Sequence, residues 1–246
     1  MGRKQPINLL IVEVLVQQVG RVKPAEMADS YLLELTRRSM LQVYKRTPDG
    51  NPIKFKMHDL LRELALSVSE AENFCTVITG EQGNMEIKAR RLSLQGNNVQ
   101  LRSYRGLSKV HTLFVFSPSI IPSSLSAVLS SLKWVAVLNL RVTPIVELPP
   151  EIVYFFNLIY LNLSKTNIEK LSKLSLIKVG DDLLKRLRYM TQLRALSVAE
   201  VKEAHEKDLC ISIEGMKLLQ RLWVSTVDRN EVLRMDALSS VPPVSR

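Results

Sequence analysis

Two nine-residue stretches decide the fold of this chain: VLNLRVTPI at residues 137–145 and YLNLSKTNI at residues 160–168. They align without a gap, and leucine, asparagine, threonine and isoleucine recur at the same places in both. A match of this extent predicts that one structural unit is repeated along the chain.

The repeat extends in both directions as an LxxLxL pattern. With the second leucine as the anchor, the pattern recurs at Leu92, Leu113, Leu138, Leu161, Leu196 and Leu222. The gaps between anchors are 21, 25, 23, 35 and 26 residues, and four of the five fall within the window of roughly 20–29 that is typical of leucine-rich repeats. The long gap predicts an insertion around Lys178 to Arg188.

A polar residue is expected five positions after each anchor, where it bonds the turn that follows the strand. Asn97, Thr143 and Thr166 occupy this position in three repeats, whereas Pro118, Val201 and Val227 occupy it in the others. The sequence therefore predicts repeats that differ in regularity.

Each such repeat places one short strand beside the next in a parallel sheet, with the leucines filling a shared core. The residues that flank the anchors then form a concave surface, which is typical of partner binding rather than catalysis. We expect the partner-binding side chains on this surface to be Tyr160, Asn162, Arg194, Ser197, Gln220, Arg221 and Trp223. Trp134 is interpreted as a packing residue, and Trp223 as packing or as an interface anchor.

The first 80 residues follow a different pattern. Apolar residues recur at helical spacing from Pro24 to Met40 and again from about Asp59, with Asp59 the expected N-cap. Between them, two alternating segments flank the turn-forming stretch Thr47 to Pro52, which predicts a hairpin. Helix, hairpin and helix over about 50 residues are typical of a winged-helix unit, so a DNA-binding regulator is one alternative function.

The predicted architecture is therefore α/β. A small winged-helix-like domain at residues 1–80 is followed, at residues 81–246, by an irregular leucine-rich-repeat solenoid with a parallel sheet.

The bulk composition narrows the classes of function. The net charge of +10 is compatible with nucleic acid or a membrane surface as partner, but the basic residues are dispersed in short clusters, which favours a solvated basic face. Two distant cysteines, Cys75 and Cys210, predict a reducing compartment rather than a disulfide scaffold. The three histidines show no metal-ligand spacing. The apolar run near the N-terminus contains Glu13 and is too short to span a bilayer, so we expect it to pack internally in a cytoplasmic chain.

Four stretches carry a resemblance to a known family: residues 28–35, 39–43 and 57–65, and the repeats with their Leu-Asn-Leu-x-x-Thr-x-Ile pattern. Together they resemble plant disease-resistance proteins of the coiled-coil nucleotide-binding leucine-rich-repeat class, from the winged-helix end of the nucleotide module onward. Met57-His58-Asp59 is similar to the family's Met-His-Asp motif. The resemblance implies a role in innate immunity, through protein recognition and autoinhibition.

In that family the nucleotide module is an ADP/ATP switch, and the motif histidine lies near the phosphates of ADP. The resemblance assigns this cofactor contact to His58, while local satisfaction at a helix start is the alternative. The chain contains no Gly-Lys dipeptide and hence no phosphate-binding loop of the family type. We therefore expect a truncated family member with no enzymatic activity and no cofactor of its own, although an ADP-binding remnant stays open. The expected partners are proteins: its own switch module, a pathogen effector or a guarded host protein.

Overall fold

In the computed structural model, the structure describes residues 24–80, 85–96, 104–145, 149–164, 166, 190–201, 203, 206–226 and 234–238. The chain divides into two compact units, Met1–Glu72 and Asn73–Arg246. The predicted insertion at 178–188, the N-terminal apolar run and Asn97 all lie outside the described residues.

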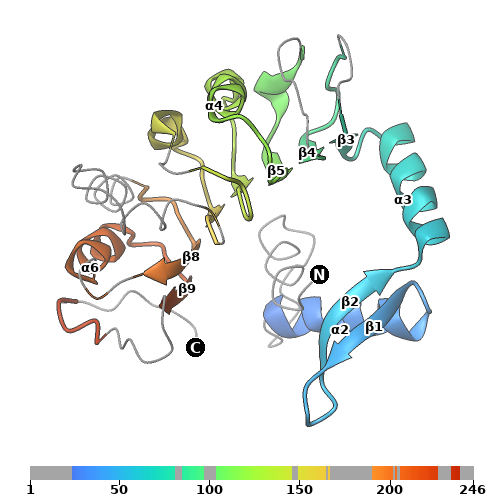
Figure 1. Ribbon diagram of the computed structural model, residues 1–246, viewed down its shortest axis with the longest axis horizontal. Coiled ribbons are helices and arrows are strands. Elements are labelled where there is room, and N and C mark those ends of the chain that lie inside the picture. The colour runs from blue at the N-terminus through green and yellow to red at the C-terminus, as the bar shows by residue number, and fades with distance from the viewer. Residues whose placement is uncertain are drawn as a thin grey trace. The chain divides into compact units, whose positions relative to one another are not determined.

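The first unit has the predicted order of elements. Helix α2 (Pro24–Arg37) leads into the antiparallel hairpin of β1 (Leu41–Arg46) and β2 (Pro52–Met57), and helix α3 (Asp59–Ala71) follows (Figure 1). The hairpin turn closes where the Thr47 N–H donates to the Asn51 carbonyl at 2.8 Å. Gly50 adopts a φ of 81° in this turn, a conformation that glycine enters without steric cost.

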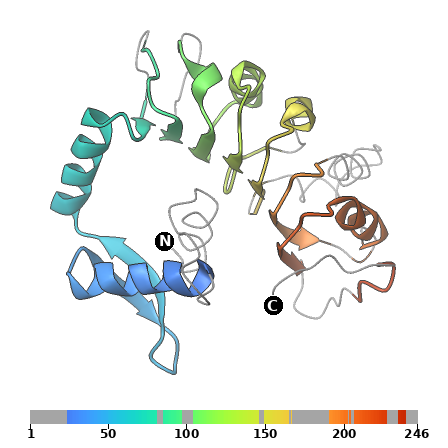
Figure 2. The same cartoon turned by 180° about the vertical axis from the view of Figure 1, so that it is seen from behind.

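The second unit is built on a parallel sheet whose seven strands pair in sequence order. The strands are β3 (Thr76–Ile78), β4 (Arg91–Gln95), β5 (Thr112–Phe116), β6 (Val137–Asn139), β7 (Tyr160–Asn162), β8 (Ala195–Val201) and β9 (Arg221–Thr226). Figures 1 and 2 show these strands side by side in a curved row. Strand β3 was not predicted, because its repeat lacks the leucine pattern.

The predicted anchors are confirmed as equivalent positions, because consecutive anchors are direct partners in the sheet. Leu92 pairs with Leu113, and the same register continues through Leu138, Leu161, Leu196 and Leu222. Every described anchor except Leu222 is buried. The sequence repeat therefore corresponds to one turn of the chain per strand.

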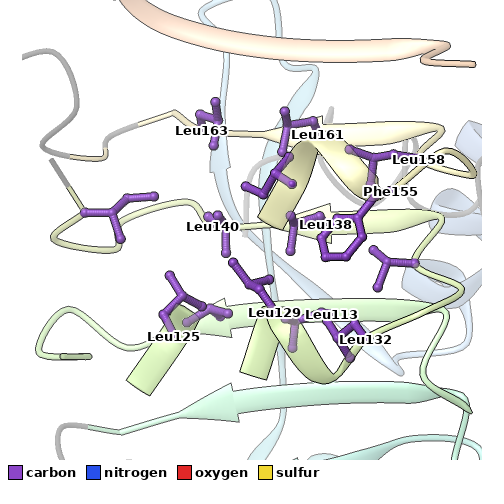
Figure 3. Close-up of a cluster of buried hydrophobic side chains, with 14 of the residues drawn as sticks. Leu113, Leu125, Leu129, Leu132, Leu138, Leu140, Phe155, Leu158, Leu161 and Leu163 are labelled. Atoms are coloured by element: carbon purple, nitrogen blue, oxygen red, sulfur yellow. The ribbon is translucent and has the colours of Figure 1, made fainter. Parts of the chain in front are cut away.

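Helical segments cover the outer side of the curved row of strands. They are α4 (Pro122–Ser131), α6 (Glu206–Gly215) and the short 3-10 helices η1 (Leu107–Lys109) and η2 (Pro150–Tyr154). Figure 3 shows leucines of α4, including Leu125 and Leu129, against the strand leucines Leu113, Leu138 and Leu161. These side chains belong to one continuous apolar core. In the described part of the chain, no helix is both long and apolar enough to cross a membrane.

One packing prediction is wrong. Trp134, expected in the core, is 57% exposed, because it occupies a turn before β6 rather than a strand or helix face. The apolar face of α3 is also uncovered: Leu60, Leu64 and Val68 are all exposed, and no residue of this helix is buried.

Candidate interaction surface

The residues that flank the anchors form two rows across the sheet. The residue before each anchor gives the row Arg91, Thr112, Val137, Tyr160, Ala195 and Arg221, and the residue after it gives the row Ser93, Phe114, Asn139, Asn162, Ser197 and Trp223. Because alternate residues of a strand point to opposite faces, both rows lie on the face opposite the leucine core. The helices cover the outer side, so we call this surface the inner face.

Tyr160 and Asn162 lie on the inner face as predicted, but both are buried, with exposures of 1% and 4%. The Asn162 Nδ2 donates to the Tyr160 hydroxyl at 3.2 Å. Burial raises the pKa of Tyr160, and this increase is opposed by the Asn162 hydrogen bond and by the charges of Arg221 and Arg141. These two residues therefore shape the floor of the inner face instead of offering contact area.

Asparagine side chains also fix the turns at the ends of β6 and β7. The Asn139 Oδ1 accepts from the Arg141 backbone N–H at 3.1 Å, and the Asn162 Oδ1 accepts from the Ser164 N–H at 3.0 Å. A few residues later, the Thr143 hydroxyl donates to the Leu140 carbonyl at 2.6 Å, and the Thr166 hydroxyl donates to the Leu163 carbonyl at 2.9 Å. The prediction that both threonines bond the turn is thus confirmed.

Ser197, Arg221 and Trp223 are the predicted residues that the inner face presents partly exposed. Ser197 and Trp223 are direct partners across β8 and β9. Burial lowers the pKa of Arg221, while the neighbouring Tyr160 raises it. The guanidinium of Arg221 and the indole of Trp223 lie on the same face as the buried floor. Arginine and tryptophan are among the side chains that most often anchor protein interfaces.

Arg194 and Gln220 do not share the inner face with these residues. Each lies directly before its strand, and the Gln220 N–H donates to the Arg194 carbonyl at 2.9 Å. Both are exposed at the edge of the sheet where the strands begin. The structure thus divides the seven predicted residues among a buried floor, a partly exposed patch and an edge.

Sequence reasoning missed an aromatic pair on the inner face. The rings of Phe114 and Phe116 stack in β5 with centroids 6.0 Å apart and an angle of 5° between the planes. Phe114 directly follows the anchor Leu113, so the same position rule that selected Asn162 and Trp223 would have found it.

His58 lies at the start of α3 and is exposed. Its Nδ1 accepts from the Leu60 backbone N–H at 3.4 Å, so the histidine, and not the predicted Asp59, is the N-cap of this helix. Asp59 is instead the first residue of the helix, where a carboxylate is favoured by the helix dipole. Within the described residues, no group of three His, Cys, Asp or Glu side chains is placed to bind a metal.

Residues 1–65 match the family model of the disease resistance protein winged helix domain. The whole chain is 29% identical, over an alignment of 320 positions, to the disease resistance protein RPM1 of Arabidopsis thaliana, and covers 34% of that protein. It is 24% identical over 255 positions to Pik-2 of rice, Oryza sativa subsp. japonica, with 99% of this chain and 23% of the relative covered.

A third relative is the ToMV resistance protein Tm-2(2) of tomato, Solanum lycopersicum. It is 31% identical over 124 positions, which cover 46% of this chain and 14% of the relative. The chain thus spans about a third or less of the length of the relatives it matches.

Proposed function

We infer from these matches that the chain belongs to the family of plant disease-resistance proteins, and we propose that it acts in defence by recognising protein through the inner face of its sheet. The partner is either the switch module of the family or a foreign or guarded polypeptide. Recognition and restraint are two uses of one surface in this proposal, since a face occupied by the switch module is closed to another partner.

The proposal includes the assignment of the second unit as leucine-rich repeats. Its support is the register of the anchors across six strands, together with the equivalent bonds of Thr143 and Thr166. Leucine-rich repeats present the residues that flank their anchors to partners, because those residues face away from the shared core.

The observation that carries the proposal is the contrast between floor and patch on the inner face. Tyr160 and Asn162 are buried and hydrogen-bonded to each other, which holds the floor in one arrangement. Ser197 and Trp223 lie beside this floor and remain partly exposed. A partner that meets a fixed surface loses less side-chain entropy on binding than one that must order a flexible surface.

The nucleotide chemistry of the family is assigned to the switch module and not to this chain. His58 is engaged with its own helix, and the sequence has no Gly-Lys dipeptide. We accordingly propose that the purified chain does not hydrolyse ATP, because no lysine and no hydroxyl of a phosphate loop are present to stabilise the transferred phosphoryl group. Turnover above background that disappears in His58→Ala would contradict this assignment.

Placement in the cytoplasm is part of the same proposal. It rests on the family resemblance and on the position of Cys75 and Cys210, which lie 135 residues apart in the sequence, a cysteine usage that is typical of a reducing compartment.

The test of the proposed face is the double variant Ser197→Glu with Trp223→Ala. It removes one aromatic anchor and adds a charge beside it, while the buried floor is unchanged. We expect its affinity for a switch module taken from a full-length family member to fall at least about 30-fold, the loss of about 2 kcal/mol that is typical of an interface anchor.

The matched control is Ser108→Glu with Trp134→Ala, the same two changes at exposed positions away from the inner face. Circular dichroism verifies that both variants are folded. If the inner-face variant binds the switch module as the wild type does, and no other protein partner is lost, the inner face is not the recognition surface.

A further inference from the structure

The edge where the strands begin has the same backbone geometry in several repeats. A tight turn precedes the strand in four of them, closed by a hydrogen bond from Val110 N to Leu107 O (3.0 Å), Leu158 N to Phe155 O (3.0 Å), Leu193 N to Met190 O (3.1 Å) and Leu219 N to Met216 O (2.9 Å). The two central residues of each turn are exposed. Since the strands are parallel and in register, these turns lie along one edge of the sheet, which we call the turn edge.

A second line of backbone bonds holds the turn edge together. The His111 N–H donates to the Arg90 carbonyl, and the same bond links Ala136 to His111, Ile159 to Ala136 and Arg194 to Ile159, at 2.8–2.9 Å. Residues that are far apart in the sequence therefore become neighbours. At roughly 4.8 Å between strands, the turn edge from β4 to β9 extends on the order of 25 Å.

The turn edge gathers basic residues that are dispersed in the sequence. Six exposed side chains lie there: Lys88, Arg90, Lys109, Lys133, Arg194 and Lys217. In the part of the chain that the structure describes, none of the six makes an ion pair with a carboxylate. A nearby acid, Glu86, forms an isolated backbone bridge with Arg105, a residue of opposite charge.

Exposed apolar side chains lie between these cations. Trp134 directly follows Lys133, Phe156 is 75% exposed in the turn before β7, and Leu218 directly follows Lys217. They lie in the connections that precede β6, β7 and β9, and they are not part of the apolar core. Large apolar groups exposed next to unpaired cations are typical of a surface that meets a partner.

We propose that the turn edge docks on an anionic lipid bilayer, with Trp134 and Phe156 entering the headgroup region and the six cations meeting the lipid charges. The inner face, with its protein partner, is a separate surface in this account. Indole rings favour the membrane interface, and lysine can extend its aliphatic stem along it while its ammonium stays in water.

The arrangement favours lipid over another anionic partner. A bilayer interface takes cationic and apolar side chains together without a pocket of matched shape, and it can meet a row that runs along a whole edge. An acidic protein would require a pocket for each exposed ring. A nucleic acid would pair with the cations but would leave Leu218 without a stacking partner.

The test is sedimentation of the full chain with vesicles of phosphatidylcholine alone and of phosphatidylcholine mixed with phosphatidylserine. We expect binding to the mixed vesicles alone, and a decrease as salt is added. The charge variant Lys109→Gln with Lys133→Gln should lower the partition coefficient about 25-fold, about fivefold for each cation removed from the surface. Its control, Lys45→Gln with Lys54→Gln, removes the same charge from exposed positions of the hairpin and should leave binding unchanged.

The apolar contribution is tested by Phe156→Ala against Tyr44→Ala, since both aromatic residues are 75% exposed. Only the first should weaken vesicle binding, by at least about tenfold for a buried ring. Equal losses in the paired variants, or no binding to the mixed vesicles, would overturn the proposal. Duplex DNA or polyglutamate bound with the same dependence on Phe156 and Lys133 would overturn the lipid assignment as well. These results do not test the inner face, which is a separate surface. The inner-face variant Ser197→Glu with Trp223→Ala should bind vesicles as the wild type does.

Discussion

The two units of this chain use helices of the same sequence pattern with opposite results. In α4 the apolar face, Leu125, Val128 and Leu129, is buried against the strand leucines. In α3 the corresponding face, Leu60, Leu64 and Val68, is exposed. Apolar spacing thus predicts that a helix forms, whereas the presence of a neighbouring element decides whether its face is covered.

The same difference runs through both units. Among the described residues, the buried apolar side chains of the first unit are Ala28, Leu32 and Phe55, whereas those of the second form one core that continues from strand to strand. We infer that the sheet unit is stable by itself, and that the winged-helix unit gains less stability from its own packing.

The largest difference is expected for a charge placed on an apolar face. Leu161→Asp puts a carboxylate in the core, where Leu161 is fully buried, and should destabilise the sheet unit by more than ~4 kcal/mol. Neighbouring repeats should unfold with it, since each is stabilised by the next. Leu64→Asp, on the exposed face of α3, should cost less than ~1 kcal/mol. Thermal unfolding followed by circular dichroism distinguishes them, and equal losses would contradict the comparison.

A smaller difference is expected for two glycines that both have a positive φ. Gly106, with φ of 86°, lies so close to the Ile87 carbonyl that an added Cβ would collide with it, while Gly50, with φ of 81°, faces open space. Gly106→Ala should therefore cost roughly 2–4 kcal/mol from strain and overlap, and Gly50→Ala about 1 kcal/mol from strain alone. Urea denaturation measures both. A Gly106→Ala protein as stable as Gly50→Ala would show that the β4–β5 connection adjusts freely.

Loss of one hydroxyl should produce a smaller difference in stability loss between the two units. In Thr166→Val the Leu163 carbonyl loses the shorter of its two hydrogen bonds from Thr166, the one from the buried hydroxyl, which should cost about 1–2 kcal/mol. In Thr47→Val the Asn51 N–H loses its acceptor in the exposed hairpin turn, but water replaces it, so the cost should stay below about 0.5 kcal/mol. Denaturation midpoints measure both losses of stability. A larger loss for Thr47→Val than for Thr166→Val would mean that the hydroxyl contributes more to stability in the hairpin turn than in the repeat turn.

The smallest effect appears only in alkaline solution. Burial raises the pKa of Tyr160 above its ordinary value of 10.0. The unfolded chain then releases the phenolic proton first, so the stability contributed by neutral Tyr160 is complete below pH 10 and is lost as pH rises through the higher folded pKa. Burial also raises the pKa of Cys210, so its contribution is lost in the same direction. Tyr160→Phe should make the alkaline loss of stability shallower. An unchanged slope would mean that Tyr160 is not the group responsible.

The sequence predicts those features that depend on local pattern. The anchors from Leu92 to Leu222, the hairpin and the bonds of Thr143 and Thr166 followed from spacing and side-chain chemistry. Strand β3 was missed, because Thr76 occupies the place of an anchor leucine in the register.

The features that depend on neighbours in space could not be predicted in this way. Burial of Tyr160 is caused by side chains from other strands. Arg194 lies at the edge of the sheet because it is the residue directly before Ala195, the first paired residue of β8. The turn edge is the clearest case: its cations are dispersed in the sequence, and only the stacking of repeats brings Arg90 and Arg194 to the same side of the sheet.

Hydrogen exchange of the full chain, free and with an added switch module, tests the central claim most directly. In the free chain, the amides of β4 to β8 should exchange slowest, while those of α3 exchange early, because its apolar face is uncovered. With the switch module present, new protection should appear in β8 and β9, where Ser197 and Trp223 lie. Exchange at one common rate in both units, or a bound module that leaves β8 and β9 unchanged, would contradict the account.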